Sequence, residues 1–256
     1  MINKEIEDGI IIATFTGSKS NSINAETIEH LNAIVDEVEA KEELKGIVLT
    51  GEGKFFSSGF DMPMFLNFKD HAEVVDFFSK EEEALLKFFT CEKPTVAAIN
   101  GHAAAAGLFM AVACDYRIAK NHPKIRLGMS EIKLGLGLPL VAGGVLKYGF
   151  DNEIALRNML YFGQFFGVER AKEIGAVDEI VEEDVLISRA KEIVSQWIDT
   201  PNRPFIPMKK LLKGYEAKIM RENLETENWQ DGLKCLLDEN VRNVLKLAQA
   251  ALDAKS

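Results

Sequence analysis

Two turns in this sequence consist mostly of small residues, and each directly follows an apolar segment. The first covers residues 57–61 (SSGFD) and the second residues 100–107 (NGHAAAAG). Small residues allow backbone N–H groups to approach a ligand closely. The second turn opens a helix-forming segment, whose first N–H groups are free and electropositive. Two such turns could direct two N–H groups at one anionic oxygen, although from composition alone tight helix–strand packing explains the small residues better.

A single glutamate, Glu131, stands among glycines and apolar residues in the segment 127–135 (LGMSEIKLG). Burial among apolar groups raises the pKa of a carboxyl group and makes its carboxylate a usable general base. Considered alone, this spacing fits an exposed loop glutamate better. A second acid, for example Asp61 or Glu81, could also enter the same site. For Asp61, and for Asp115, a structural role is the better explanation.

Other kinds of chemistry find little support in this chain. The spacing of a phosphate-binding P-loop is not met, and neither a G-x-G-x-x-G motif nor an H-E-x-x-H motif occurs. Three cysteines and four histidines are scattered, so we expect no metal site. The net charge of −10 argues against nucleic-acid and anionic-membrane binding. No apolar run reaches 18 residues and no signal peptide is apparent, so we expect a soluble, cytoplasmic protein.

The elements that position these turns are short apolar strands that alternate with helices. This pattern predicts α/β layers with right-handed connections. We expect strands over residues 10–15, 46–50, 94–99 and 116–119 and helices over 24–39, 72–89 and 103–114. Beyond residue 140 we expect helices over 141–148, 151–161, 168–173, 182–197, 207–215 and 223–254, with a joint at 201–204.

Taken together and in this order, the three segments resemble those of the crotonase superfamily, the enoyl-CoA hydratase/isomerase family. Residues 57–61 are similar to its first oxyanion motif and residues 94–115 to its central strand–turn–helix signature. Residues 128–135, with Pro139 and the glycine pair 143–144, are similar to its third motif. Segments 162–164 and 171–181 match the later helical part, so the resemblance extends from about residue 5 to residue 200.

This resemblance implies an α/β fold, a crotonase-like spiral of ββα units followed by a C-terminal helical trimerisation region. We expect the spiral core to span residues 1–195 and the helical region residues 196–256. The implied ligand is an acyl-CoA thioester, which is the substrate, so no cofactor is expected. The implied partners are further copies of the chain, in a trimer or a hexamer, with no nucleic acid and no membrane.

By motif position, the resemblance assigns the oxyanion hole to the backbone N–H groups of Phe60 and Ala106. It assigns the base to Glu131, whereas Phe109 stands where hydratases of the family carry a second glutamate. One base suffices to move a proton from C2 to C4 of an enoyl-CoA, but adding water takes two groups. A Δ3,Δ2-enoyl-CoA isomerase is therefore favoured over a hydratase or another hydrolase or lyase of the superfamily, and over a non-catalytic protein that binds CoA esters.

The same resemblance predicts the residues that contact the substrate. Lys19, Ser20 and Ser22 lie where the family contacts the nucleotide of CoA. Lys209 and Lys210 could face its 3′-phosphate, although a surface helix explains these two lysines better. Contacts from the C-terminal tail are uncertain, because the family pattern is unclear around residues 238–240. The full predicted set is Lys19, Ser20, Ser22, Ser58, Gly59, Phe60, Asp61, Met62, Phe65, Ala105, Ala106, Gly107, Phe109, Glu131, Gly135 and Pro139.

Overall fold

The larger of two β-sheets forms the framework of the molecule. A computed structural model describes the backbone of residues 1–253 and the side chains of residues 1–251. The strand order in this sheet is β1-β2-β3-β5-β7-β10, and all neighbours are parallel except β1 and β2. The strands are β1 Ile2–Glu7, β2 Ile10–Phe15, β3 Gly46–Gly51, β5 Thr95–Ile99, β7 Tyr116–Lys120 and β10 Glu179–Val181.

A smaller sheet of short strands branches off where the larger sheet ends. Its order is β4-β6-β8-β9, with β4, β6 and β8 parallel and β9 antiparallel to β8. The first small-residue turn follows β4, the second contains β6 and continues into helix α4 (Ala106–Ala113), and the segment with Glu131 follows β8. The strands are β4 Phe55–Ser57, β6 His102–Ala104, β8 Leu127–Gly128 and β9 Phe165–Phe166.

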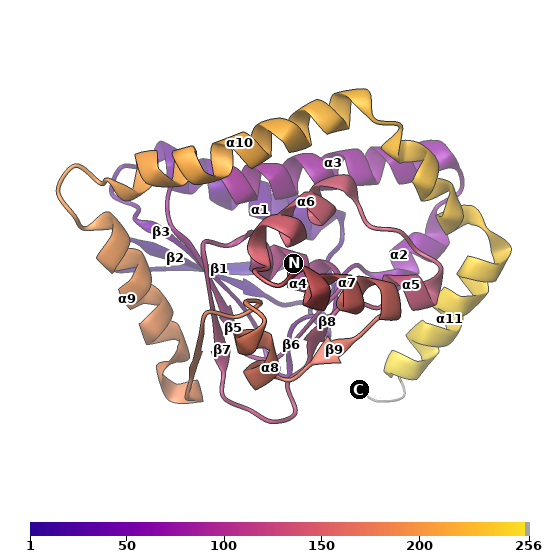
Figure 1. Ribbon diagram of the computed structural model, residues 1–256, viewed down its shortest axis with the longest axis horizontal. Coiled ribbons are helices and arrows are strands. Elements are labelled where there is room, and N and C mark those ends of the chain that lie inside the picture. The colour runs from indigo at the N-terminus through magenta and orange to yellow at the C-terminus, as the bar shows by residue number, and fades with distance from the viewer. Residues whose placement is uncertain (254–256) are drawn as a thin grey trace.

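Helices cover both faces of the larger sheet and form the whole C-terminal part (Figure 1). Helix α10 runs beside α3, and α11 packs against α2 and α5 at the far end of the molecule. The helices are α1 Ala25–Ala40, α2 Met62–Asn67, α3 His71–Thr90, α4 Ala106–Ala113, α5 Glu131–Leu134, α6 Leu140–Gly149, α7 Glu153–Phe162, α8 Val168–Glu173, η1 Glu183–Val185, α9 Leu186–Ile198, α10 Phe205–Thr226, η2 Trp229–Leu237 and α11 Glu239–Asp253.

The central strands are apolar on both faces because both faces are covered. Successive side chains of a strand point to opposite faces. Ile47 and Leu49 of β3 accordingly join the main core with α1, α3 and α4, whereas Val48 between them joins a smaller cluster under α9. This double burial explains why the sequence shows continuous apolar runs here rather than alternation.

Several sequence expectations differ from the observed elements. Residues 103–114 were expected to form one helix, but 102–104 form β6 and the helix begins at Ala106. Alanine favours helix intrinsically, yet pairing with β4 and β8 takes precedence here. Strands β1, β9 and β10 were not expected, and the segment 223–254 is divided among the end of α10, η2 and α11. The division into residues 1–195 and 196–256 stays a prediction.

A buried ion cluster anchors α10 on the core. Asp115 receives Lys209 Nζ at 2.6 Å and Lys213 Nζ at 2.8 Å on its two carboxylate oxygens. All three side chains are almost fully buried. Lys209 is therefore committed to this cluster, and the suggestion that it faces a phosphate of CoA is wrong. The structural role expected for Asp115 is the one observed.

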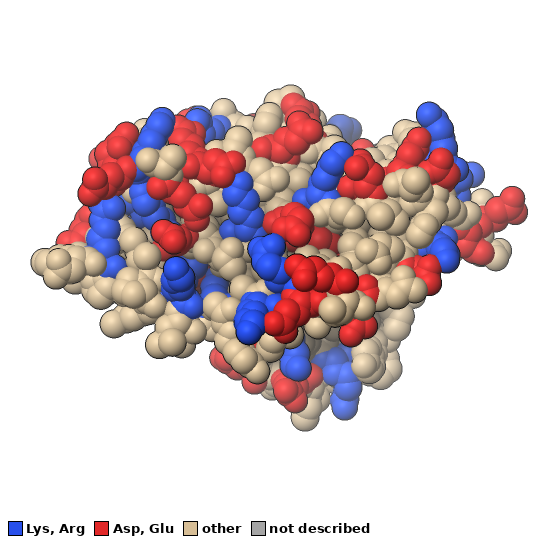
Figure 2. All heavy atoms as spheres, turned by 90° about the horizontal axis from the view of Figure 1, so that it is seen from above, with Lys and Arg blue, Asp and Glu red and all other residues tan. Residues whose placement is uncertain are grey.

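The surface carries charges of both signs. Figure 2 shows acidic and basic side chains interspersed on the face seen from above, with no large area of either sign. Within residues 1–253, none of the helices is long and apolar enough to span a membrane.

Candidate active site

The two small-residue turns touch each other. Gly59 follows β4 with φ at +98°, a conformation that favours glycine. A Cβ atom built on Gly59 would lie 2.5 Å from the Ala105 Cβ and 3.0 Å from the Ala106 nitrogen. The glycine thus permits a contact between residues that are almost fifty positions apart in the sequence. The backbone N–H groups that follow on both turns are brought into one small region.

The second turn is held in a strained conformation at the start of α4. Ala105 has φ 52° and ψ −128°, which is unusual for a residue with a side chain, and such strain is concentrated at functional sites. The Ala105 N–H donates to the Gly128 carbonyl at 3.1 Å. A Cβ on Gly107 would lie only 2.4 Å from the Ser57 carbonyl oxygen. The first turn of α4 therefore lies directly on the end of β4.

The backbone N–H groups of Phe60 and Ala106 have no acceptor among the described residues, and the same holds for Gly107, the next residue of α4. Next to them, Gly59 N–H donates to Ser57 Oγ at 3.1 Å and Asp61 N–H to the Ile23 carbonyl at 2.9 Å. Unpaired N–H groups are uncommon in protein interiors. Here they occur on two turns in contact, one of them at a helix N-terminus, which suits an anionic oxygen.

Glu131 lies at the start of α5, three residues after β8. Its Oε2 atom is buried and has no hydrogen-bond partner within the described structure. Burial raises the pKa of Glu131 above its usual value, and the backbone N–H groups of Glu131 and Ser130 offset part of this effect. A carboxylate that has one unpaired oxygen and a raised pKa has the properties of a general base.

One large cavity joins the turns to Glu131. Its volume is about 990 Å³, and apolar side chains dominate its wall. A cavity of this size accommodates a sizeable ligand. Of the predicted substrate contacts, those that line it are Ser58, Phe60, Met62, Phe65, Ala105, Phe109, Glu131 and Pro139.

Several predicted contacts lie beside the cavity rather than in its wall. Gly59, Ala106 and Gly107 form the turns behind it, and Gly135 ends α5 in a left-handed conformation. Asp61 lies in the N-cap position of α2 and accepts a hydrogen bond from Ser22 Oγ at 3.4 Å.

The loop that contains Lys19 lies next to the cavity. Ser58, in the cavity wall, donates its hydroxyl proton to Ser20 Oγ at 3.0 Å, and its backbone N–H donates to the Ser20 carbonyl at 2.9 Å. Lys19 is exposed in the same loop. The structure therefore places this loop beside the first turn, whereas its contact with CoA stays a prediction.

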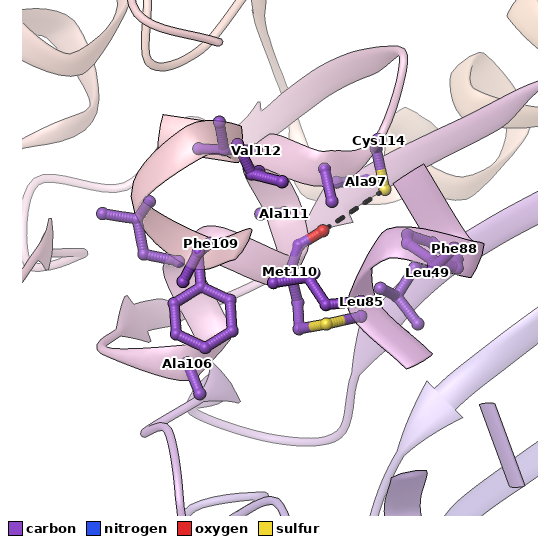
Figure 3. Packing of buried hydrophobic residues seen from close by; sticks show 14 of the residues in the cluster. Leu49, Leu85, Phe88, Ala97, Ala106, Phe109, Met110, Ala111, Val112 and Cys114 are labelled. Carbon is purple, nitrogen blue, oxygen red and sulfur yellow. Dashed lines mark hydrogen bonds between the residues drawn. The ribbon is translucent and has the colours of Figure 1, made fainter. Parts of the chain in front are cut away.

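Phe109 occupies the position one helical turn beyond Ala106. Figure 3 shows both side chains on the same side of α4, whereas Met110 points toward Leu85 of α3. Phe109 is 1% exposed and lines the large cavity. At this position the cavity is therefore lined by a hydrocarbon ring rather than by a polar side chain that could act on a ligand.

Glu81 lies behind this ring, in a separate small cavity of about 20 Å³. Its side chain is buried, its Oε2 atom has no partner among the described residues, and burial and the neighbouring Glu82 raise its pKa well above the usual value. Phe60 and Phe109 line both cavities, whereas Glu81 lines only the small one. The aromatic rings thus stand between Glu81 and the space that Glu131 faces.

The C-terminal part of the chain supplies a wall of the cavity that the sequence did not reveal. Residues of η2 and α11 line it, together with the end of α10. The exposed carboxylate Glu227 also belongs to this wall. An apolar stripe along 229–253 was the available signal, but only the fold shows which surface it covers. Wall residues from this part include Asn223, Asn228, Trp229, Leu233, Leu236, Leu245 and Ala248.

Two basic side chains at the cavity were also missed. His102 and Arg126 line it, and the Arg126 N–H donates to His102 Nδ1 at 3.1 Å. Burial and the Arg126 charge lower the pKa of His102, which favours the neutral ring. Among the residues described, no cluster of three or more His, Cys, Asp or Glu side chains could hold a metal ion.

Comparison with known proteins gives consistent matches. A family model described as enoyl-CoA hydratase/isomerase matches residues 5–231. Enoyl-CoA delta isomerase 1, mitochondrial, from Rattus norvegicus is 29% identical over 228 residues, which cover 88% of this chain and 76% of the relative. The fatty acid oxidation complex subunit alpha of Pseudomonas putida (strain GB-1) is 33% identical over 203 residues, 76% of this chain but 27% of that protein.

A solved structure shows the same fold over the full length. The crystal structure of human mitochondrial delta3-delta2-enoyl-CoA isomerase matches with a TM-score of 0.89 at 22% identity, covering 100% of this chain and 99% of that one. The predicted crotonase-like α/β fold is confirmed, whereas the trimerisation role of the helical region stays a prediction.

Proposed function

The chain belongs to the enoyl-CoA hydratase/isomerase family, and from this premise we propose that it is a Δ3,Δ2-enoyl-CoA isomerase. The substrate is an acyl-CoA thioester with a double bond between C3 and C4. The product carries that double bond between C2 and C3. The reaction moves one proton and involves no net oxidation, so the proposal includes no cofactor.

In the first step, the Glu131 carboxylate takes a proton from C2. The electron pair of that C–H bond moves into the thioester, and its oxygen becomes an enolate oxygen. The N–H groups of Phe60 and Ala106 donate to this oxygen, and one such donor is worth about 3 kcal/mol. In the second step, the thioester carbonyl re-forms, the C2–C3 double bond forms, and C4 takes the proton from Glu131.

One observation carries the choice of isomerase over hydratase. Glu131 places a carboxylate with a buried, unpaired Oε2 atom in the cavity wall, and Phe109 closes the position from which a second acid would act beside it. Hydration requires one group to activate water and another to handle the C2 proton. The separation of Glu81 by the rings of Phe60 and Phe109 supports the same choice.

We propose that the CoA part of the substrate contacts Lys19, Ser20 and Ser22. The bond between Ser58 and Ser20 supports this placement, because it joins that loop to the cavity wall. The net charge of −10 does not attract an anionic ligand, so local N–H groups and basic side chains must offset the charge of its phosphates.

The direct test compares two substrates with the purified protein. We expect conversion of a 3-enoyl-CoA to the 2-enoyl-CoA to exceed hydration of crotonyl-CoA. Faster formation of 3-hydroxyacyl-CoA would instead assign the chain to the hydratases. Binding of CoA esters without turnover would assign a non-catalytic role.

The base is tested by Glu131→Gln, with Glu227→Gln as the matched control. Both side chains line the cavity, but Glu131 is partly buried, with its Oε2 atom shielded from solvent, whereas Glu227 is exposed. We expect the first substitution to lower kcat by about 10²–10⁴-fold, the usual contribution of a general base. The second should leave kcat within about twofold. Full activity of Glu131→Gln would remove Glu131 from the mechanism.

We further propose that the chain self-associates, as a trimer or a hexamer. Large apolar side chains on α10 are exposed, including Leu211 at 80% and Tyr215 at 69%, and such clusters mark interaction surfaces. Light scattering of the purified protein measures the oligomeric state directly.

The location of the protein in the cell stays a prediction. The chain was expected to be cytoplasmic, whereas the rat relative is named as mitochondrial.

A further inference from the structure

We propose that Glu82 is a positioning residue, which holds the segment between Glu131 and α6 so that the base keeps its place in the cavity. The role assigned to Glu131 rests on the proposed function. The contact between Glu82 and α6 stands on the structure alone.

Glu82 binds the start of α6 from the interior of α3. Its Oε2 atom accepts the Val141 N–H at 2.7 Å, and its Oε1 atom accepts the Leu140 N–H. The first N–H groups of a helix have no partner within the helix, and a carboxylate is favourable at this end. The N-cap residue of α6 is Pro139, which makes no side-chain cap. Glu82 supplies the missing acceptor from a helix almost sixty residues earlier.

One of the two bound amides belongs to Leu140, a residue of the cavity wall. Residues 136–140 all line the cavity, and they connect α5 directly to α6. The Leu136 N–H donates to the Glu131 carbonyl at 3.0 Å, so the start of this segment is tied to the base itself. A shift of Leu140 away from Glu82 would therefore be passed along a short segment to Glu131.

Burial makes this arrangement unusual for a glutamate. The Glu82 side chain is 0% exposed, and burial raises its pKa to about 7 even though the Leu140 and Val141 N–H groups lower it. A glutamine would retain the shape and one acceptor oxygen. Its amide group would present N–H donors to one of the two α6 amides, which leaves that amide unpaired in the interior.

The next residue on α3 provides a matched control. Glu83 is exposed and forms an ion pair with Arg221 at 3.5 Å, away from α6. Glu82→Gln and Glu83→Gln make the same chemical change on adjacent positions of one helix. A general effect of losing a negative charge from α3 should appear in both variants, whereas a loss of positioning should appear only in the first.

The experiment measures kinetics and amide hydrogen exchange on both variants at a temperature where circular dichroism shows them folded. For Glu82→Gln we expect faster exchange of the Leu140 and Val141 amides. We also expect a kcat lower by about 10–100-fold, the scale of an ångström misplacement of a catalytic group, with KM changed less than about threefold. The acid limb of the pH–kcat/KM profile should move to lower pH, because a displaced Glu131 is better hydrated. Glu83→Gln should match the wild type.

Unchanged exchange at Leu140 and Val141 in Glu82→Gln would overturn the proposal, as would a kcat equal to that of Glu83→Gln. Failure of the wild type to isomerise 3-enoyl-CoA would refute the proposed function, while the exchange data would still decide whether Glu82 holds α6. If Glu82→Gln does not fold, exchange in the wild type decides. Slow exchange of both amides supports the proposal, and exchange as fast as at Glu153 and Ile154, which begin α7, overturns it.

Discussion

Substitution of Gly59 by alanine perturbs the site with the addition of a single methyl group. The new Cβ would lie 2.5 Å from the Ala105 Cβ, and ordinary contact begins at about 3.5 Å. The two turns must therefore separate by about 1 Å. The atom would also lie 3.0 Å from the Ala106 nitrogen, which is one of the two proposed oxyanion donors.

The geometry sets the expected magnitude. Misplacement of a catalytic group by 1 Å costs about 100-fold, and complete loss of one oxyanion donor costs about 10²–10³ in kcat. An alanine at φ +98° adds backbone strain of about 1–3 kcal/mol to the folded state. We therefore expect Gly59→Ala to lower kcat by about 10²–10³-fold and to lower the free energy of unfolding by about 1–3 kcal/mol.

Gly53→Ala is the control for Gly59→Ala, because it introduces backbone strain without a steric clash. Gly53 also has a positive φ, +68°, but a Cβ there meets nothing within 4 Å. This variant should lose some stability and keep its isomerase rate within about twofold. The assay follows 2-enoyl-CoA formation, with urea unfolding measured in parallel. Equal rates for the two variants would refute the inference that contact between the turns builds the oxyanion site.

Three further predictions follow from the same structure. Since burial raises the pKa of Glu131, kcat/KM should be full above that raised pKa and fall about tenfold per pH unit below it; an acid limb at or under pH 4.5 would contradict this. Asp115→Asn leaves the two α10 lysines without their buried counter-charge, so urea titration should show a loss of about 3–5 kcal/mol, and a loss under about 1 kcal/mol would refute the anchoring role. Ala248→Phe fills part of the cavity and should lower kcat/KM about tenfold for long acyl chains but not for short ones, whereas the exposed Ala250→Phe should affect neither; equal effects of the two would exclude α11 from chain-length selection.

The parts of the fold that the sequence predicted are those with a strong local signal. The apolar runs of β3 and β5 are buried on both faces, and their composition alone indicates this. The turn around Gly59 stood out because only small residues permit close contact. By contrast, residues 102–104 form a strand only because two distant strands pair with them. No local property of an alanine-rich segment reveals that pairing.

In the candidate site, too, the features with a local sequence signal were predictable and those that depend on distant contacts were not. The motif positions of Glu131 and Phe60 were readable, and both line one cavity. The burial of Lys209 depends on Asp115, 94 positions earlier in the chain, so an apparently exposed helical lysine proved to be internal. The contact between Glu82 and Leu140 spans 58 positions and has no sequence signature. Contacts of this kind follow from the packing of whole helices.

The most direct measurement of the central claim follows a label through the reaction. The account assigns both proton transfers to one carboxyl group, Glu131, which takes the proton from C2 and returns it to C4. With a 3-enoyl-CoA deuterated at C2, a single turnover should place deuterium at C4 of the product, detected by mass spectrometry. A product whose new C4 hydrogen comes entirely from solvent would contradict the single-base account.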